Sequence, residues 1–260
     1  MPENGQKKSV ISMEYKCPIC KDTGFELYED ENGYSCAREC KCGLRKREAM
    51  NNKLKFAALP SAFVGTNLDN FKTDIYKLDE SVKIINTDMK AVRYWLSNYD
   101  MMKQSGIGLY FYSQTKGSGK TRLAVSIANE LIEKKNVSVK FTTSIQLIDE
   151  IKATWDKGYE FTEHQLLEDL SNAEVLIIDD FGAELAKPWI MERFYQVINN
   201  RYISNRITIF TSNMNIDSLE YDDRITNRIK ERSYALAFPE ESIREQIYKN
   251  NMAGLIAAIA

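Results

Sequence analysis

The stretch GLYFYSQTKGSGKT, residues 108–121, decides the fold of this chain. It starts as an apolar strand, passes through a glycine-rich turn and enters an amphipathic helix at Lys120. Glycines let backbone N–H groups approach phosphate oxygens, and the N-terminus of a helix attracts anions. The pattern predicts a phosphate-binding loop in which Lys120 contacts the β- and γ-phosphates and Thr121 ligates Mg²⁺. One position departs from the pattern: Gln114 stands where its first glycine is expected.

Outward from this loop, apolar strands alternate with periodic helices. The predicted strands are residues 108–113, 137–143, 175–179, 207–213 and 234–238, and the predicted helices are residues 81–99, 120–135, 145–155, 163–171, 188–203 and 223–231. Strands separated by helices indicate a parallel sheet with right-handed crossovers. We therefore expect an α/β fold with a P-loop core, in which helices flank a parallel sheet.

Two carboxylates follow the buried strand VLII, residues 175–178. Parallel sheets place ligands at the carboxyl ends of their strands, and Mg²⁺ on a nucleotide needs a carboxylate there. Asp179 is the predicted Mg²⁺ partner, through water. Asp180 is the predicted base that orients the attacking water.

Polar residues also end the next strand, in Thr211-Ser212-Asn213. Asn213 is suited to hold the attacking water or to sense the γ-phosphate, although Asn at the end of a strand is as often a turn residue.

Two arginines lie four apart on the predicted helix 223–231, Arg224 and Arg228. An arginine presented across a subunit interface can stabilise charge at a neighbour's γ-phosphate. The alternative is an exposed helix whose arginines pair with nearby acids.

All five cysteines of the 260-residue chain lie between residues 17 and 42, and Cys17 and Cys20 form a C-x-x-C knuckle. Structural Zn²⁺ takes four thiolates from two short loops. The remaining cysteines, Cys36, Cys40 and Cys42, leave more than one set of four open. A basic helix follows, since residues 41–55 hold six Lys or Arg and one Glu. We divide the chain into a zinc module with this helix (1–58), a nucleotide-binding domain (59–250) and a tail (251–260).

The composition is that of an ordinary globular protein, with 43% hydrophobic and 28% charged residues and a net charge of −2. It excludes a globally basic nucleic-acid coat protein. The sequence has no membrane-spanning apolar run and no signal peptide, so we expect a cytoplasmic protein with no membrane partner. Lys152, Lys157, Tyr159 and Phe161 mix charge with aromatic rings, but an ordinary helix and loop account for them equally well, so no DNA-contacting residue is assigned.

Taken together, these motifs resemble AAA+ ATPases of the DnaC/DnaI helicase-loader group and the similar IstB transposition helper proteins. The motifs that carry the resemblance are TKGSGKT (115–121), VLIIDDFGAE (175–184), TIFTSN (208–213) and DRITNRI (223–229). The similarity spans residues 16–245. Only 22 residues follow Phe238, too few for the helical lid of larger AAA+ proteins, so we expect no full lid, as in that group.

The resemblance implies roles for individual residues. It implies ATP and Mg²⁺ as ligands, with nucleotide contacts from Gly117, Ser118, Gly119, Lys120, Thr121, Arg122 and a sensor arginine, Arg244. It favours Arg228 over Arg224 as the arginine finger, and it favours Cys17, Cys20, Cys40 and Cys42 as zinc ligands. Asp180 stands where vigorous AAA+ ATPases have Glu, which suggests slow hydrolysis.

The function implied is an ATP-dependent loader that binds a hexameric replicative DNA helicase and delivers it to single-stranded DNA. Such a loader forms a homo-oligomer with ATP at its subunit interfaces, and its N-terminal module binds the helicase. Two alternatives stay open: an IstB-like transposition helper acting on duplex DNA, and a nucleotide-sensing adaptor with negligible hydrolysis.

Overall fold

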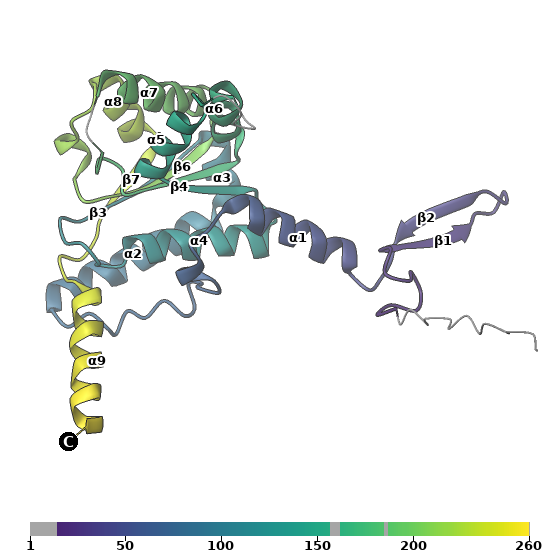
Figure 1. Ribbon diagram of the computed structural model, residues 1–260, viewed down its shortest axis with the longest axis horizontal. Helices are drawn as coiled ribbons and strands as arrows, with labels where there is room; N and C mark the ends of the chain where they lie inside the picture. The colour runs from purple at the N-terminus through teal and green to yellow at the C-terminus, as the bar shows by residue number, and fades with distance from the viewer. Residues whose placement is uncertain (1–14, 157–161, 185–186, 260) are drawn as a thin grey trace, which may run out of the picture. The chain divides into compact units, whose positions relative to one another are not determined.

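A computed structural model describes residues 15–156, 162–184 and 187–259 of the chain. The chain divides into two compact units, Met1–Asn52 and Lys53–Ala260, and each is described by itself (Figure 1). Helix α1, Leu44–Ala57, belongs in part to each unit.

The N-terminal unit contains a two-stranded antiparallel hairpin, β1 (Phe25–Glu29) and β2 (Ser35–Glu39). One Asp30 carboxylate oxygen closes the turn by accepting from the backbone amides of Asn32 and Tyr34, both at 2.9 Å. These strands were not predicted from the sequence. Neither strand alternates buried and exposed residues, so the period-2 signal of a strand packed on a core is missing.

The second unit is built on a five-stranded parallel sheet. Its strands are β3 (Gly108–Tyr112), β4 (Val139–Thr143), β5 (Val175–Asp179), β6 (Ile207–Ser212) and β7 (Ser233–Ala237), in the order β4-β5-β6-β3-β7. This confirms the predicted parallel α/β architecture. All five carboxyl ends therefore meet at one edge, with β6 between the strand of the phosphate loop and the strand of the two acids.

Helices cover both faces of this sheet. The helices described in this unit, besides the end of α1, are α2 (Asp79–Ser97), α3 (Tyr99–Ser105), α4 (Lys120–Lys135), α5 (Ser144–Ala153), α6 (Glu163–Asn172), α7 (Pro188–Ile203), α8 (Asp223–Glu231) and α9 (Ile243–Ile259), with short 3₁₀ turns at Ser61–Phe63 and Ile216–Ser218. Helix α9 buries none of its residues and extends away from the sheet (Figure 1). In Figure 1, α2 and α4 lie on one face and α5 to α8 on the other. Helix α4 buries Leu123, Ile127 and Leu131 completely, as its four-residue spacing requires.

The side chain of Arg201, on α7, is almost completely buried inside this unit. Its guanidinium donates to the carbonyls of Leu170 and Ala173, both at 2.8 Å, and to the Thr208 hydroxyl at 3.0 Å. Burial lowers the pKa of Arg201 to about 9. Buried polar groups destabilise a fold unless they are hydrogen-bonded. Arg201 therefore stabilises this unit, because it donates to carbonyls at the end of α6 that have no partner within the helix.

The C-terminal residues differ from the sequence expectation. Residues 251–259, expected from the sequence to form a tail, continue α9, and α3 was also not predicted. No helix in the described parts of the chain is both long enough and apolar enough to cross a membrane.

Candidate functional site

The phosphate loop leaves β3 at Ser113 and enters α4 at Lys120. The Lys120 ammonium points back into the loop and donates to the carbonyls of Ser113 and Thr115, both at 3.1 Å. Burial lowers the pKa of Lys120, although the carboxylates of Asp180, Glu240 and Asp179 act in the opposite direction. The loop therefore holds a buried cation at its centre, bonded to groups that an anion could replace.

Two glycines in this loop have conformations and surroundings that exclude a side chain. Gly117 and Gly119 have φ angles of 77° and 110°, in the region that favours glycine. A Cβ on Gly119 would lie 2.9 Å from the Tyr76 hydroxyl, which itself donates to the carbonyl of Ser118 at 2.6 Å. Tyr76 thus fixes the loop from outside, a role that no local motif signals.

Glu240 holds the first turn of the loop, where the expected glycine is replaced by Gln114. Its two carboxylate oxygens accept from the backbone amides of Gln114 and Thr115, each at 2.8 Å. Although burial acts to raise it, the pKa of Glu240 is lowered, because Thr115 and the Gln114 amide donate hydrogen bonds to the carboxylate. Glu240 was not predicted from the sequence, but its place just after β7 puts this residue at the same sheet edge as the loop.

Asp179, at the end of β5, is joined directly to the phosphate loop. The Thr121 hydroxyl donates to Asp179 Oδ1 at 2.9 Å, and the Thr211 hydroxyl of β6 donates to the same oxygen at 2.5 Å. Burial is the main cause that raises the pKa of Asp179, while these hydrogen bonds act to lower it. The two predicted Mg²⁺ ligands are therefore in contact, and a hard cation prefers oxygen ligands of this kind.

A cavity of about 410 Å³ opens beside this pair. It is lined by Phe63, Lys116, Gly117, Ser118, Gly119, Lys120, Thr121, Arg122, Asp180, Ala183, Asn213, Ile243, Arg244 and Ile247. Four cationic side chains and one carboxylate line it, a balance that suits a polyanion. Asp180 reaches it from a left-handed turn, with a φ of 52°, and its amide donates to the Thr211 hydroxyl at 3.0 Å.

The first turn of α9 closes one side of this cavity. The backbone amides of Ile243 and Arg244 donate to the carbonyl of Gly117 at 3.0 and 3.3 Å. A Cβ on Gly117 would lie 2.8 Å from Arg244 Cβ, so the helix and the loop touch. Sequence reasoning singled out Arg244 but missed Ile243 and Ile247, because both stand in a segment with no clear periodicity.

The two candidate arginines of α8 lie elsewhere. Arg224 and Arg228 are absent from the lining of this cavity and pack against α7 instead. Any contact between Arg228 and a γ-phosphate would therefore involve a second copy of the chain.

Four cysteines of the N-terminal unit gather at one point: Cys17, Cys20, Cys40 and Cys42. The sulfur atoms of Cys17 and Cys40 are 3.8 Å apart, and those of Cys20 and Cys42 are 3.6 Å apart. Tetrahedral Zn²⁺ with Zn–S bonds of about 2.3 Å requires sulfur separations of about 3.8 Å. The donor set fits zinc. Cys36, on β2, is not part of the group.

The geometry of the knuckle also favours a thiolate. The carboxylate of Asp22 accepts from the backbone amides of Lys16 and Cys17 at 3.0 and 2.9 Å, which folds the loop around the sulfur atoms. The backbone amide of Cys20 is the main cause that lowers the pKa of Cys17 to about 7, whereas the pKa of the neighbouring Cys40 is raised, so without metal the thiolate is favoured at Cys17 alone of these two. A thiolate is the form that binds metal.

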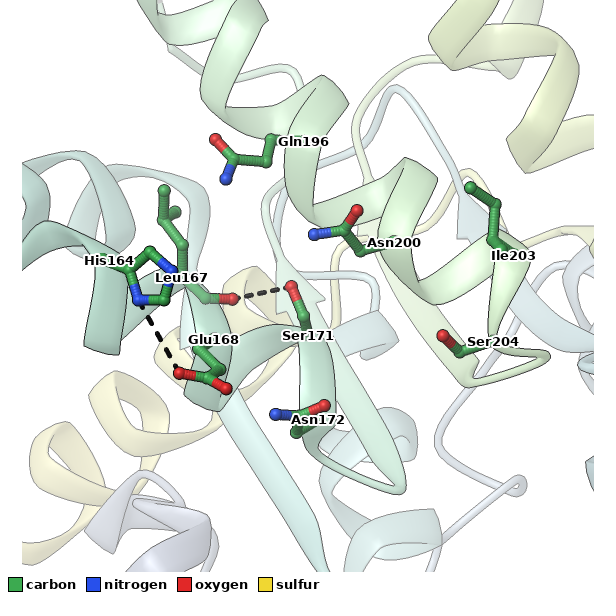
Figure 2. A pocket seen from close by; sticks show the side chains of 9 residues that line it. All are labelled: His164, Leu167, Glu168, Ser171, Asn172, Gln196, Asn200, Ile203 and Ser204. Atoms are coloured by element: carbon green, nitrogen blue, oxygen red, sulfur yellow. Dashed lines mark hydrogen bonds and ion pairs between the residues drawn. The ribbon is translucent and has the colours of Figure 1, made fainter.

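A second hollow, of about 350 Å³, lies between α6 and α7 (Figure 2). Polar side chains line most of it; His164 Nδ1 lies 3.7 Å from Glu168, and Ser171 donates to the carbonyl of Leu167 at 2.6 Å. None of the residues singled out from the sequence lines it. Of the aromatic and basic residues weighed for DNA contact, Lys157, Tyr159 and Phe161 lie outside the described residues.

Comparison with known proteins gives one family and several relatives. Residues 111–246, more than half of the chain, match the model of the IstB-like ATP binding proteins. The phage-like element PBSX protein XkdC of Bacillus subtilis is 25% identical over 84% of this chain and 79% of its own length. The replicative helicase loader DnaC of Buchnera aphidicola (subsp. Baizongia pistaciae) is 31% identical, over 54% of this chain and 58% of its own length. A crystal structure of the DnaC helicase loader is 26% identical, with a TM-score of 0.57, over 69% of this chain and all of that one.

The fold and the site define a P-loop protein of the AAA+ class. The chain belongs to the family of IstB-like ATP-binding proteins, and within it the chain is DnaC-like. The resemblance stated from the motifs is thereby confirmed.

Glu240 gives a first test of the nucleotide site. Replacing it with Ala (Glu240→Ala) removes two charge-assisted hydrogen bonds that shape the loop. We expect the affinity for ATP to fall about tenfold, since one such bond contributes about 1.5 kcal/mol or more. Glu240→Gln, which keeps one acceptor oxygen, should lose less. Titration with a fluorescent ATP analogue measures both, and equal affinities for Glu240→Ala and the wild type would contradict the role of this carboxylate.

Proposed function

We propose that the chain is an ATP-dependent loader of a hexameric replicative DNA helicase, which it delivers to single-stranded DNA. The observation that carries the proposal is a DnaC-like nucleotide-binding unit joined to a separate cysteine module. Relatives named replicative helicase loader support the role in DNA replication. Slow ATP hydrolysis is part of the proposal, because Asp180 is one methylene shorter than the Glu expected of a vigorous ATPase.

The residues of the cavity suggest how the site would work. The ammonium of Lys120 would exchange the carbonyls of Ser113 and Thr115 for oxygens of the β- and γ-phosphates. Thr121 and Asp179 would hold Mg²⁺, which when bound neutralises charge that develops on the phosphates. Asp180 and Asn213, both at the cavity, would orient the attacking water.

Three further parts of the chain have roles in the proposed function. Arg244 of α9 would sense the nucleotide within the same subunit, since it lines the cavity. Arg228 would reach the γ-phosphate of a second copy in a homo-oligomer. The four-cysteine cluster, holding Zn²⁺, would shape the surface that binds the helicase.

A pull-down with the cognate replicative helicase tests the proposal. The helicase is immobilised, and the wild type, Cys17→Ser and Cys36→Ser are each added with ATP or with ADP. We expect binding that depends on the nucleotide for the wild type and for Cys36→Ser, because Cys36 lies outside the cluster. Cys17→Ser should not bind. Unchanged binding by Cys17→Ser would overturn the role given to the module, and no binding by any form would overturn the loader function.

The match to the IstB-like family model favours one alternative, a transposition helper that oligomerises on duplex DNA. Co-sedimentation with duplex DNA in ATP, without any binding to helicase, would support it. A third outcome, equal ATP turnover by the wild type and Asp180→Asn in the presence of DNA and helicase, would indicate a nucleotide-sensing adaptor.

A further inference from the structure

Arginine and tyrosine side chains alternate along the contact between α7 and α8. The guanidinium carbon of Arg224 lies 4.8 Å from the ring centre of Tyr195, and that of Arg232 lies 4.8 Å from the ring centre of Tyr202. Arg228 lies between the two rings, at 5.1 and 5.4 Å from their centres. Contacts of this kind between a cation and a ring face are attractive.

Arg228 is also held by hydrogen bonds. Its Nε donates to Asn199 Oδ1 of α7 at 2.9 Å, and its Nη1 donates to the carbonyl of Arg224 at 2.7 Å. The Tyr195 hydroxyl lies 3.5 Å from Nη2. A guanidinium carries five N–H donors, so these three contacts leave two for another partner.

Arg224 and Arg228 also differ in whether a nearby carboxylate compensates their charge. Arg224 forms two hydrogen bonds to the Asp222 carboxylate, both at 3.0 Å, so its charge is compensated within the chain. The partners of Arg228 are an amide oxygen, a carbonyl and two rings, and no carboxylate of the described residues lies within 4 Å of it. The charge of Arg228 helps to lower the pKa of Asp222, but the two side chains form no ion pair, so the guanidinium can still bind an external anion.

We propose that Tyr195 and Asn199 are positioning residues that hold the Arg228 guanidinium ready for the γ-phosphate bound to a second copy of the chain. This inference rests on the proposed function, in which Arg228 acts between subunits. A free arginine side chain loses rotamer entropy when it is immobilised, and the contacts with α7 immobilise Arg228 before the subunits associate. Tyr195 and Asn199 orient the Arg228 side chain and do not themselves contact the nucleotide.

Substitutions on α7 test the positioning role of Tyr195 and Asn199 separately from the role of Arg228. Asn199→Ala and Tyr195→Leu release Arg228, whereas Tyr195→Phe keeps the ring face. Asn200→Ala is a matched control, because Asn200 faces the hollow between α6 and α7 instead (Figure 2). For ATP hydrolysis by the full chain we expect kcat to fall roughly tenfold or more for the first two, with KM unchanged, because a small misplacement of a transition-state contact can cost up to about 100-fold. For Tyr195→Phe, which keeps the ring, and for Asn200→Ala, kcat should stay within about twofold of the wild type.

Association supplies a readout that does not need turnover. With ADP and aluminium fluoride, which mimic the transferring phosphoryl group, light scattering should show oligomers for the wild type, Tyr195→Phe and Asn200→Ala. Arg228→Ala, Asn199→Ala and Tyr195→Leu should form fewer. If Arg228→Ala keeps both hydrolysis and association, the proposed role of Arg228 between subunits fails. If Arg228→Ala loses them while Asn199→Ala and Tyr195→Leu do not, only the positioning role of α7 is wrong.

Discussion

Chelation of zinc should unfold the hairpin of the N-terminal unit and leave the P-loop unit folded. Among residues 15–43, the buried side chains are those of Cys20 and Cys40, while Leu27 and Tyr34 are 78% and 70% exposed. An isolated two-stranded hairpin is at best marginally stable in water. A structural zinc site contributes about 10–16 kcal/mol at pH 7, which is far more than the few apolar contacts here can supply.

Amide exchange and limited proteolysis measure this result. With a chelator, residues 15–43 should lose protection and be cleaved, while the strands of the parallel sheet keep theirs. Cys17→Ser should bring about the same loss without a chelator, and Cys36→Ser should still carry one zinc per chain. If the hairpin stays protected once zinc is removed, or if the purified chain carries no zinc, the cysteine cluster is not a structural metal site.

Much of the P-loop unit could be predicted from the sequence, because its elements bury continuous or periodic apolar faces. The predicted bounds of α4, β5, α7 and α8 are the same as those of the structure. Helix α9 could not be found in this way. Its apolar residues, such as Ile247, Tyr248 and Leu255, are 46%, 63% and 54% exposed and do not mark one buried face.

Part of the candidate site could likewise be predicted from the sequence, and part could not. Lys120, Thr121 and Asp179 follow from local patterns, because a glycine-rich loop between a strand and a helix, followed by a strand that ends in acids, is typical of a nucleotide site. Tyr76 and Glu240 do not follow, since they act on the loop from 42 and 126 residues away along the chain. The spacing of the cysteines left more than one set open. The resemblance favoured Cys17, Cys20, Cys40 and Cys42, and the fold brings the sulfur atoms of these four together.

Replacing the buried lysine (Lys120→Ala) should nearly abolish nucleotide binding. Two opposite unit charges about 4 Å apart interact by about 4 kcal/mol at an effective dielectric constant of 20. Loss of that contact corresponds to an affinity about 1000-fold weaker. The substitution also removes the bonds from Lys120 Nζ to Ser113 and Thr115, so the loop loses its internal support together with the phosphate contact.

Lys116→Ala is the matched control, because Lys116 lies in the same loop and lines the same cavity but is exposed. Exposed charges interact weakly in water, so this variant should lose affinity by no more than about fivefold. Titration with a fluorescent ATP analogue in the presence of Mg²⁺ compares the two, and thermal unfolding without nucleotide verifies that both variants fold. If Lys120→Ala binds as tightly as Lys116→Ala, the triphosphate does not lie at the start of α4. In that case the assignments of Thr121, Asp179 and Arg244 to the nucleotide would have to be abandoned with it, because each depends on the phosphates lying there.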